Sequence, residues 1–201
     1  MSFSALFTLF LHGSCYLIPF LIIVLLLKSP RFNGFLGEFA IHTSIKHSLN
    51  PDQFHLLKDV TIPYEDGVTH LDHVIVSKFG VFVLETRNMK GWIFGSEREK
   101  TWSQKFYEYT AKFQNPLHQN FEQVKTLQQL LGLTNEQIHS LVVFVGDSTF
   151  KSRMPENVTK GKDYLKFIKS KTDVVLSEQE VQDVVDKIEK GLFKNEFSSA
   201  F

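Results

Sequence analysis

The sequence predicts a domain of the α/β class, in three layers or as an α+β arrangement, behind an apolar N-terminal segment. Stretches with helical periodicity and with strand periodicity alternate along residues 34–146. The chain is 43% apolar and 22% charged, as an ordinary globular protein is. Its 201 residues leave room for one domain with appendages.

The N-terminal segment has the length and composition of a membrane anchor. Residues 2–27 contain no Asp, Glu, Lys or Arg, and about 20 apolar residues suffice for a helix to cross the hydrocarbon core. A cleaved signal peptide is the alternative, but it would have a basic start and a shorter apolar stretch. Lys28 and Arg31 follow the segment, so the positive-inside rule places the C-terminal domain in the cytoplasm. We therefore expect residues 1–28 to form a single-pass transmembrane helix in the cell membrane, with the N-terminus outside.

A short linker, residues 29–33, is expected between the anchor and an amphipathic helix that ends at Asn50-Pro51. The apolar face of this helix includes one acid among residues spaced by three and four: Phe35, Glu38, Ile41, Ile45 and Leu49. Strand-like runs and a small hairpin follow, at residues 55–63, 71–77, 80–87, 92–94 and 101–104.

A second helix and a central strand complete the expected core, residues 34–146. Asn115-Pro116 is typical of a helix start and Gly132 of a helix end. The apolar stripe between them is Leu117, Phe121, Val124, Leu127 and Leu131. Residues 141–145 form the short apolar run expected of a strand that is covered on both faces. Residues 147–201 are expected to form a C-terminal extension on the core, with a strand at 173–176 and a helix that begins at Ser177.

Net charge and cysteine content limit the possible functions. The formal net charge is zero at pH 7, so nucleic-acid binding would depend on a local patch or on a bound metal rather than on an overall basic field. Neutral charge also leaves open a membrane-bound interaction domain that binds no nucleic acid. The single cysteine, Cys15, excludes an internal disulfide framework and a cysteine-rich zinc site.

Two strands flank a turn centred between Lys78 and Phe79, and their register follows from residue numbers. In that register Asp72 lies directly opposite Glu85. Directly paired like charges are destabilising, so a compensating group is expected. Residues two apart on a strand share a face, which puts Arg87 on the same face as Glu85. The alternative is that the acids are ordinary surface residues in weak ion pairs with nearby basic groups.

The acidic residues form an oxygen-ligand set suited to Mg²⁺ or Mn²⁺, with Asp72 and Glu85 on the strands and Glu38 on the preceding helix. Such a cation would relieve the repulsion, polarise a phosphoryl oxygen and lower the pKa of a bound water, as phosphodiester hydrolysis requires. Arg87 would lie within reach of the same site and stabilise the charge that develops. For Glu38 the alternative is an acid near the positive end of its helix.

Several short strings around these residues resemble the nuclease-related domain (NERD) family. They follow one another in the order and at the spacing of that family, from about Gly34 to about Leu131. The strings are Gly37-Glu38, Leu71-Asp72-His73, Phe82-Val83-Leu84-Glu85-Thr86-Arg87, Gly91-Trp92-Ile93-Phe94-Gly95, Trp102-Ser103-Gln104 and Asn115-Pro116-Leu117-His118-Gln119-Asn120. The family is similar in turn to the PD-(D/E)xK nucleases, whose restriction-endonuclease-like core is a helix, a three-stranded antiparallel meander, a helix and a further strand.

The resemblance implies a chemistry and a set of site residues. The chemistry is divalent-metal-dependent hydrolysis of nucleic-acid phosphodiesters, with DNA as the expected substrate and Mg²⁺ or Mn²⁺ as the cofactor. Asp72 and Glu85 would be the metal-binding carboxylates and Glu38 the helix-borne acid. Gln104 and Gln119 would be accessory polar residues, although Gln119 lies off the apolar stripe and would be solvated unless another element covers it.

One position departs from the family pattern. The family motif ends Glu-x-Lys, whereas this chain has Glu85-Thr86-Arg87. Lysine can lose its proton when its surroundings depress its pKa, and arginine effectively cannot. If catalysis needs a neutral amine, the alternative is a silent nucleic-acid-binding or scaffolding module. If it needs only a fixed positive charge, Arg87 serves, because its planar fork suits phosphate.

Two histidines and two tryptophans are expected to be structural. His70 and His73 fall on opposite faces of their strand, which argues against a shared zinc site. Trp92 and Trp102 are expected to pack in the core or in the small hairpin, with base stacking on a single strand as the alternative.

Overall fold

The computed structural model describes residues 16–25, 29–64 and 67–191. Contacts divide the chain into two compact units, residues 1–36 and residues 37–201. The residues of the candidate site all belong to the second unit.

The predicted anchor, residues 1–28, lies largely outside the described residues. Residues 16–25 are helical, and their apolar side chains, such as Leu17 and Phe20, are exposed. Within the described part of the chain, no helix is both long and apolar enough to span a membrane. Helix α2 begins at Pro30, within the predicted linker at residues 29–33, and proline is favoured in the first turn of a helix. The division into anchor, linker and domain stays a prediction.

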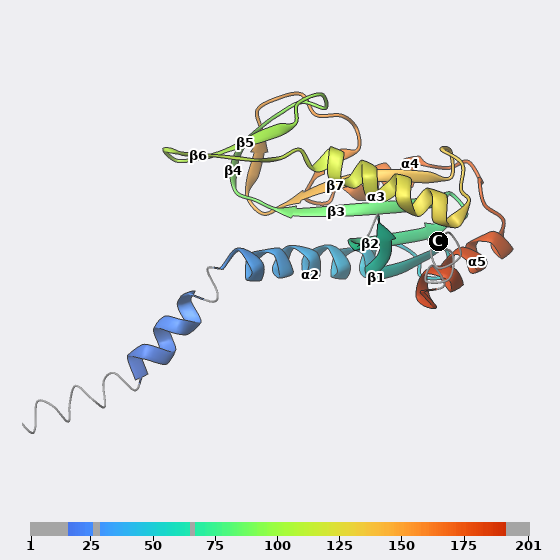
Figure 1. Ribbon diagram of the computed structural model, residues 1–201, viewed down its shortest axis with the longest axis horizontal. Coiled ribbons are helices and arrows are strands. Elements are labelled where there is room, and N and C mark those ends of the chain that lie inside the picture. The colour runs from blue at the N-terminus through green and yellow to red at the C-terminus, as the bar shows by residue number, and fades with distance from the viewer. Residues whose placement is uncertain (1–15, 26–28, 65–66, 192–201) are drawn as a thin grey trace, which may run out of the picture. The chain divides into compact units, whose positions relative to one another are not determined.

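The chain forms a mixed α/β fold, and Figure 1 labels its elements. The helices beyond residue 29 are α2 (Pro30–Ser48), α3 (Pro116–Leu131), α4 (Asp163–Ser170) and α5 (Glu178–Glu189). The strands are β1 (Phe54–Tyr64), β2 (Gly67–Ser77), β3 (Gly80–Asn88), β4 (Gly91–Phe94), β5 (Thr101–Phe106), β6 (Tyr109–Gln114), β7 (Ile138–Val145), β8 (Ser148–Phe150) and β9 (Val158–Lys160). The predicted order of helix, three strands, helix and strand is confirmed, with a small sheet inserted between β3 and α3.

A five-stranded sheet forms the centre of the domain, in the order β1-β2-β3-β7-β9. The strands β1, β2 and β3 form an antiparallel meander, and β7 runs parallel to β3 over its whole length. This confirms residues 141–145 as part of a central strand. The turn between β2 and β3 is tight, because Ser77 pairs with Gly80.

Helices cover both faces of this sheet. One face of β2 and β3, which includes Val74 and Val83, packs against apolar residues of α3 and α5. The other face, which includes Ile75 and Phe82, packs against α2 and α4. Because side chains alternate along a strand, each residue of β2 and β3 faces one layer or the other.

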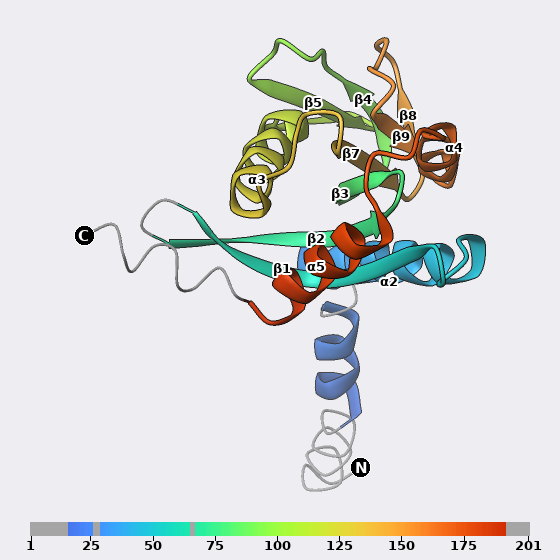
Figure 2. The same cartoon turned by 90° about the vertical axis from the view of Figure 1, so that its right-hand side faces the viewer.

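A second sheet has four strands in the order β6-β5-β4-β8. Figure 2 shows it beyond α3, away from β1 and β2. The expected hairpin of β4 and β5 is confirmed, whereas β6 and β8 were not predicted. The inner face packs Ile93 and Trp102 against Val142 and Phe144 of β7, which joins the two sheets through one apolar cluster.

The predicted limits of α3 and α5 follow from local chemistry. Asn115 caps α3, since its side chain accepts a hydrogen bond from the backbone of Leu117, and Gly132 ends the helix in the left-handed conformation. Ser177 and Glu180 form a complete capping box at the start of α5.

The C-terminal extension differs from the prediction in two ways. Residues 173–176 form no strand. Instead, the amides of Val175 and Leu176 donate to the carbonyl of Lys78, and the Leu176 side chain is buried in the core. The apolar run was therefore selected for packing and not for strand pairing. Helix α4 and strand β9 were not predicted, and both are too short for a clear periodic signal.

Candidate active site

Asp72 on β2 and Glu85 on β3 face the same layer. The register of the two strands pairs His73 with Leu84 and Val74 with Val83, as the turn predicted. One residue further along, the same register brings Asp72 opposite Glu85. Both lie two residues from core positions that face α3. The geometric prediction on which the metal hypothesis depends is therefore met.

Asp72 stands where the pairing of β2 with β3 ends. Its Oδ2 accepts a 2.7 Å hydrogen bond from the backbone N–H of Thr86, so the carboxylate takes the place of a main-chain partner. Burial raises the pKa of Asp72 above its ordinary value, against the hydrogen bond from Thr86 and the charge of Arg87. The carboxylate is thus held in place while part of its charge is uncompensated.

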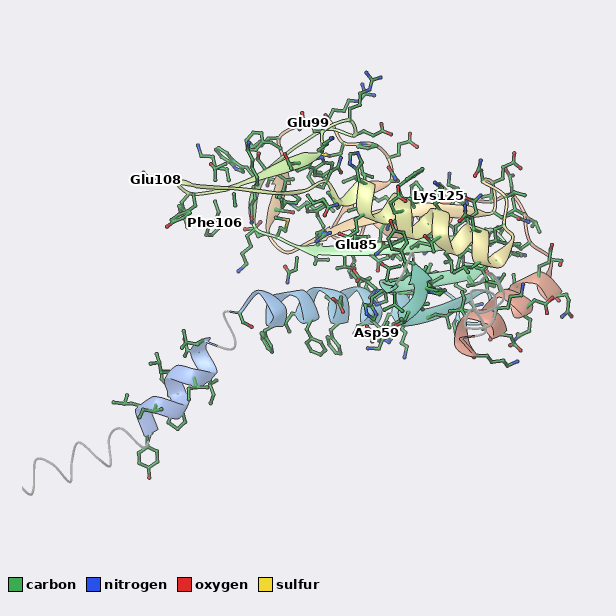
Figure 3. The ribbon with its side chains drawn as sticks, viewed as in Figure 1. Asp59, Glu85, Glu99, Phe106, Glu108 and Lys125 are labelled. Atoms are coloured by element: carbon green, nitrogen blue, oxygen red, sulfur yellow. The ribbon has the colours of Figure 1, made fainter. Side chains whose placement is uncertain are left out.

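Glu85 is buried, with 4% of its surface exposed, and Figure 3 labels it on β3. Burial and then the negative charge of Asp72 raise the pKa of Glu85 to about 7, although the charge of Arg87 and a hydrogen bond from Gln123 oppose the shift. A carboxyl group with this pKa is about half protonated at neutral pH. A raised pKa in a cleft is typical of a functional residue.

Arg87 is fixed between two acceptors. Its Nη2 lies 2.8 Å from Glu85 Oε1 and donates a 2.7 Å hydrogen bond to Gln119 Oε1. Arg87 is therefore on the same face as Glu85, as alternation predicted. Gln119, which geometry alone left solvated, is instead the contact that connects α3 with Arg87.

Two amide side chains of α3 reach the same place and were missed by the sequence interpretation. Asn120 Nδ2 donates to the carbonyl of Val83 at 3.2 Å, and Gln123 Nε2 donates to the carbonyl of His70 at 2.9 Å. Both side chains are buried, whereas Phe121, which was assigned to the apolar stripe, is 59% exposed. The helix turns polar on its buried face because that face meets the end of the β2–β3 pairing. The spacing of Asn120, Gln123 and Leu127 was the signal, since it places them on one face.

Glu38 approaches from the other layer. It lies on α2, which packs on the sheet face opposite to α3. Gly37 allows a close approach here, because an added Cβ would lie 2.8 Å from Val145 and 2.9 Å from Asn88. Burial raises the pKa of Glu38, and the charge of Asp72 adds to that effect.

Glu38 is close enough to the pair for their charges to interact, since the charge of Asp72 raises the pKa of Glu38 and the charge of Glu38 raises that of Glu85. Among the residues that the structure describes, no group of three or more His, Cys, Asp or Glu side chains is arranged to hold a metal ion. The ligand set of Asp72, Glu85 and Glu38 stays a prediction.

Asp59 is a further acid near the pair that no sequence pattern indicated. It lies on β1 (Figure 3), between Lys58 and Val60, which pair with β2 while Asp59 does not. Its φ of 53° is in the left-handed region, which aspartate tolerates better than most residues. Its carboxylate lies 2.9 Å from the ammonium group of Lys58, and its charge raises the pKa of Asp72.

Comparison with known families decides the relationship that these residues indicate. The pattern of the nuclease-related domain matches residues 33–145. The chain belongs to the nuclease-related domain family. The match includes Glu38, Asp72, Glu85 and Arg87, and it ends where β7 ends.

One relative of this NERD protein extends beyond the domain. An uncharacterized protein of Bacillus anthracis is 34% identical over 164 residues, which is 79% of this chain and 76% of that protein. No solved structure matches the chain. The relationship thus covers part of the sequence outside the family match, where β8, β9, α4 and α5 complete the two sheets and their covering layers.

Gln104, an accessory residue by family resemblance, holds the junction between the two sheets of the NERD domain. Its Nε2 donates a 2.7 Å hydrogen bond to the carbonyl of Lys90, in the turn between β3 and β4. Gly91 follows in the left-handed region with φ of 82°, and a Cβ there would lie 2.4 Å from the carbonyl oxygen of Lys105. Gln104 is therefore placed to position the turn that follows Arg87.

A pocket of about 400 Å³ opens beside the site. It lies between the β1–β2 hairpin and the first two turns of α3. Gln119 and Gln123, which contact Arg87 and Glu85, both line it. The remaining lining residues are Tyr64, Thr69, Gln114, His118, Phe121 and Glu122. A ligand in this pocket would lie against the amides that hold the charged residues.

The histidines behave as expected. His70 Nδ1 lies 2.9 Å from the hydroxyl oxygen of Thr61 on β1. His73 is buried on the opposite face, where its ring lies 5.8 Å from the ring of His42 on α2. Burial lowers the pKa of His73 to about 4. The two residues therefore share no metal site.

Proposed function

We propose that this NERD protein is a nuclease in which Asp72 and Glu85 bind Mg²⁺ or Mn²⁺ and which hydrolyses nucleic-acid phosphodiesters, with DNA as the expected substrate. The observation that carries the proposal is the pair itself, in which Glu85 is buried and Asp72 is half-buried. Two carboxyl groups meet on one face at the end of a strand pairing, and the charge of Asp72 raises the cost of ionising Glu85. Such a pair is destabilising by itself and favourable once a cation binds.

The residues present fit a divalent cation. Mg²⁺ retains several waters and is commonly bound through one or two carboxylates together with substrate phosphates, so a third protein carboxylate is not required. Burial and the charge of Asp72 raise the pKa of Glu85, and a bound cation would lower it. Asp72 is held by the amide of Thr86 and Glu85 by Gln123 and Arg87, which keeps both groups in place.

The side chains around the pair have distinct roles in this proposal. A cation bound there supplies a polarised phosphoryl oxygen and a water of lowered pKa. Arg87, which lies beside Glu85, would stabilise the charge that develops on the phosphate. Gln119 and Gln123 orient Arg87 and Glu85, and the adjoining pocket accepts the part of the substrate next to the reacting bond.

A second candidate function is a NERD module that binds nucleic acid without cleaving it. The ion pair of Arg87 with Glu85 favours this reading, since a guanidinium already supplies the positive charge that the carboxyl group needs. Arginine also cannot lose a proton near neutral pH. In this form the protein would act as a scaffold at its site in the cell.

Membrane anchoring is part of the proposal. It is supported by the uncharged stretch of residues 2–27 and by the exposed apolar side chains of residues 16–25. With Lys28 and Arg31 after the stretch, the NERD domain would lie on the cytoplasmic side. Fractionation of cells that express the full chain tests this: recovery in the soluble fraction after high salt would contradict it.

The experiment that tests the function is a cleavage assay with the full-length protein in detergent. Labelled DNA is incubated with Mg²⁺, with Mn²⁺ or with EDTA. We expect metal-dependent cleavage that is lost in Glu85→Ala and kept in Glu136→Ala, a matched change of an exposed glutamate. Cleavage that survives Glu85→Ala would point to a contaminant or to another site. Binding without cleavage in the natural chain would select the second candidate.

A further inference from the structure

The four-stranded sheet has an outer face with its own chemistry. Alternation places Ile93, Trp102, Phe113 and Phe150 inward, on the apolar cluster beneath the sheet. Residues that pair across two strands share a face of the sheet. On the outward face Trp92 pairs with Lys105, Phe94 pairs with Ser103, and Ser103 pairs with Lys112. We call the outward residues the Trp92 face: Trp92, Phe94, Lys105, Lys112 and Lys151.

Trp92 lies between two lysines on this face. The Nζ atoms of Lys105 and Lys151 lie 6.0 Å and 4.6 Å from the centroid of its ring, which is within the range of a cation–π contact. The indole is 47% exposed and Phe94 is 37% exposed. Trp102, by contrast, is fully buried. Trp92 therefore packs on the outer side of the hairpin, because its strand position faces outward, whereas Trp102 packs in the core.

The charge of the Trp92 face is of one sign. None of the strands β4, β5, β6 and β8 contains Asp or Glu. The three lysines on the face therefore have no acidic partner within the sheet's own strands, although the whole chain has no net charge. A local positive field of this kind favours a polyanion, and it is the local patch that a neutral chain requires for nucleic-acid binding.

Exposed aromatic rings favour an unpaired strand among polyanions. Bases stack on aromatic side chains only when they are unstacked from a duplex, and a groove or surface that combines lysines with such rings is typical of single-strand binding. An acidic peptide would use the lysines and leave the stacking capacity of the rings unused. An anionic lipid surface accommodates lysines and interfacial aromatic rings alike, so vesicle binding is the competing outcome of the test. In a domain of the nuclease-related family, the combination of stacking rings and lysines favours a single strand.

The Trp92 face is close to the acidic pair along the backbone. Trp92 is five positions after Arg87, so their Cα atoms are at most about 18 Å apart. The intervening turn is held by the hydrogen bond from Gln104 to Lys90 and by that from the Gly91 amide to the carbonyl of Asp147. The two places are therefore neighbours along the backbone.

We propose that the Trp92 face binds single-stranded nucleic acid, with Trp92 and Phe94 as stacking platforms and Lys105, Lys112 and Lys151 as phosphate contacts. This inference rests on the proposed function, because it takes nucleic acid as the substrate. It adds that the bases of the substrate are unpaired where the nucleic acid contacts the four-stranded sheet. The binding itself needs no metal and no ionised Glu85.

The test is oligonucleotide binding by the full-length protein in a non-ionic detergent with EDTA, read as fluorescence anisotropy. The probe is a labelled single strand of about 12 nucleotides, a length that such surfaces cover. We expect it to bind more tightly than the matching duplex. Trp92→Ala should weaken single-strand binding about tenfold, and Trp92→Phe should keep most of it. Lys151→Gln should lower the slope of log affinity against log salt by about 0.7.

Matched controls separate the face from general effects. Tyr109 is 84% exposed near the tip of the β5–β6 hairpin, which Figure 3 marks by Phe106 and Glu108, and alternation points it away from the Trp92 face. Tyr109→Ala and Lys187→Gln, on α5, should therefore leave binding unchanged. Since Trp92 is half exposed, its replacement should leave the melting temperature unchanged within about 2 °C.

The outcomes of the two proposals are distinguishable. Glu85→Gln should bind the single strand as tightly as the natural chain does. Binding that depends on Trp92 supports this inference even if the natural chain cleaves no nucleic acid. Cleavage together with binding that Trp92→Ala does not weaken would overturn the inference and keep the proposed function. Equal binding of duplex and single strand, or Trp92-dependent binding of phosphatidylserine vesicles in place of the oligonucleotide, would also overturn it.

Discussion

The two sheets of the domain present opposite chemistry. On the five-stranded sheet the polar groups are acids that face a covering helix, and Glu85 among them is nearly inaccessible. On the four-stranded sheet they are lysines around a half-exposed indole. The acids are held by directed hydrogen bonds, whereas the lysines lie on open strands with few constraints.

This difference explains how a chain of zero net charge can suit a polyanion. Negative charge is concentrated where a cation would neutralise it, and positive charge lies where phosphates would approach. Composition averages the two regions and conceals both. We expect variants in the two regions to separate chemistry from binding.

The largest separation is expected from Asp72→Asn against Trp92→Ala. Loss of one metal-binding carboxylate removes several kcal/mol of transition-state stabilisation, so Asp72→Asn should reduce metal-dependent cleavage about 1000-fold and leave single-strand binding in EDTA intact. Trp92→Ala should weaken binding and leave the maximal rate within a few-fold. Cleavage kinetics over a range of substrate concentrations check both. If either variant changes the cleavage rate and the single-strand affinity by the same factor, the two sheets do not have separate roles.

The buried acid should make stability depend on pH in the absence of metal. The pKa of Glu85 is about 7 in the folded protein and near 4.5 in the unfolded chain. Its stabilising contribution is therefore complete below pH 4.5 and is lost as the pH rises through 7. Glu85→Gln should raise the free energy of unfolding at pH 8 by on the order of 3 kcal/mol. Urea melts from pH 5 to 8 measure this, and parallel pH profiles for the two proteins would contradict it.

Arg87→Lys separates the two candidate functions of the acidic site. The guanidinium reaches both Glu85 and Gln119, whereas an ammonium group is a point charge without that fork. For an active natural chain we expect cleavage to fall about tenfold, as for loss of a supporting contact. A gain of about 100-fold, the size of a general acid–base contribution, would instead identify the natural chain as the silent form.

The smallest effect is expected from the helix that covers the acids. Gln119→Ala removes the acceptor that holds Arg87 and should lower cleavage by several-fold to about tenfold, with no change in single-strand binding. Gln129→Ala, an exposed residue of the same helix, is the control. Equal rates for both variants would show that Arg87 needs no support from α3.

Much of the acidic site was predictable because it depends on local rules. The tight turn at Ser77 and Gly80 set the strand register, and alternation then placed Asp72, Glu85 and Arg87 on one face. Neither rule indicates which layer covers that face. For this reason the sequence treated the exposed Phe121 as a residue of the apolar stripe.

The small sheet was harder to predict because its order depends on distant pairing. β4 and β5 form a hairpin with a readable signal, but β8 joins them from more than 50 residues further along the chain. Lys151 reaches Trp92 through that pairing. Trp92 is therefore on the surface because of its position in β4, although tryptophan is a residue type that usually packs in a core.

The most direct test of the account is the melting temperature of the full-length protein at pH 8 with and without Mn²⁺, in the natural chain and in the double variant Asp72→Asn, Glu85→Gln. Saturating Mn²⁺ should raise the melting temperature of the natural chain by about 5 °C or more, because binding to the folded state alone stabilises it. The double variant should melt at the same temperature in both conditions. An equal rise in the two proteins would contradict the claim that Asp72 and Glu85 together bind the ion.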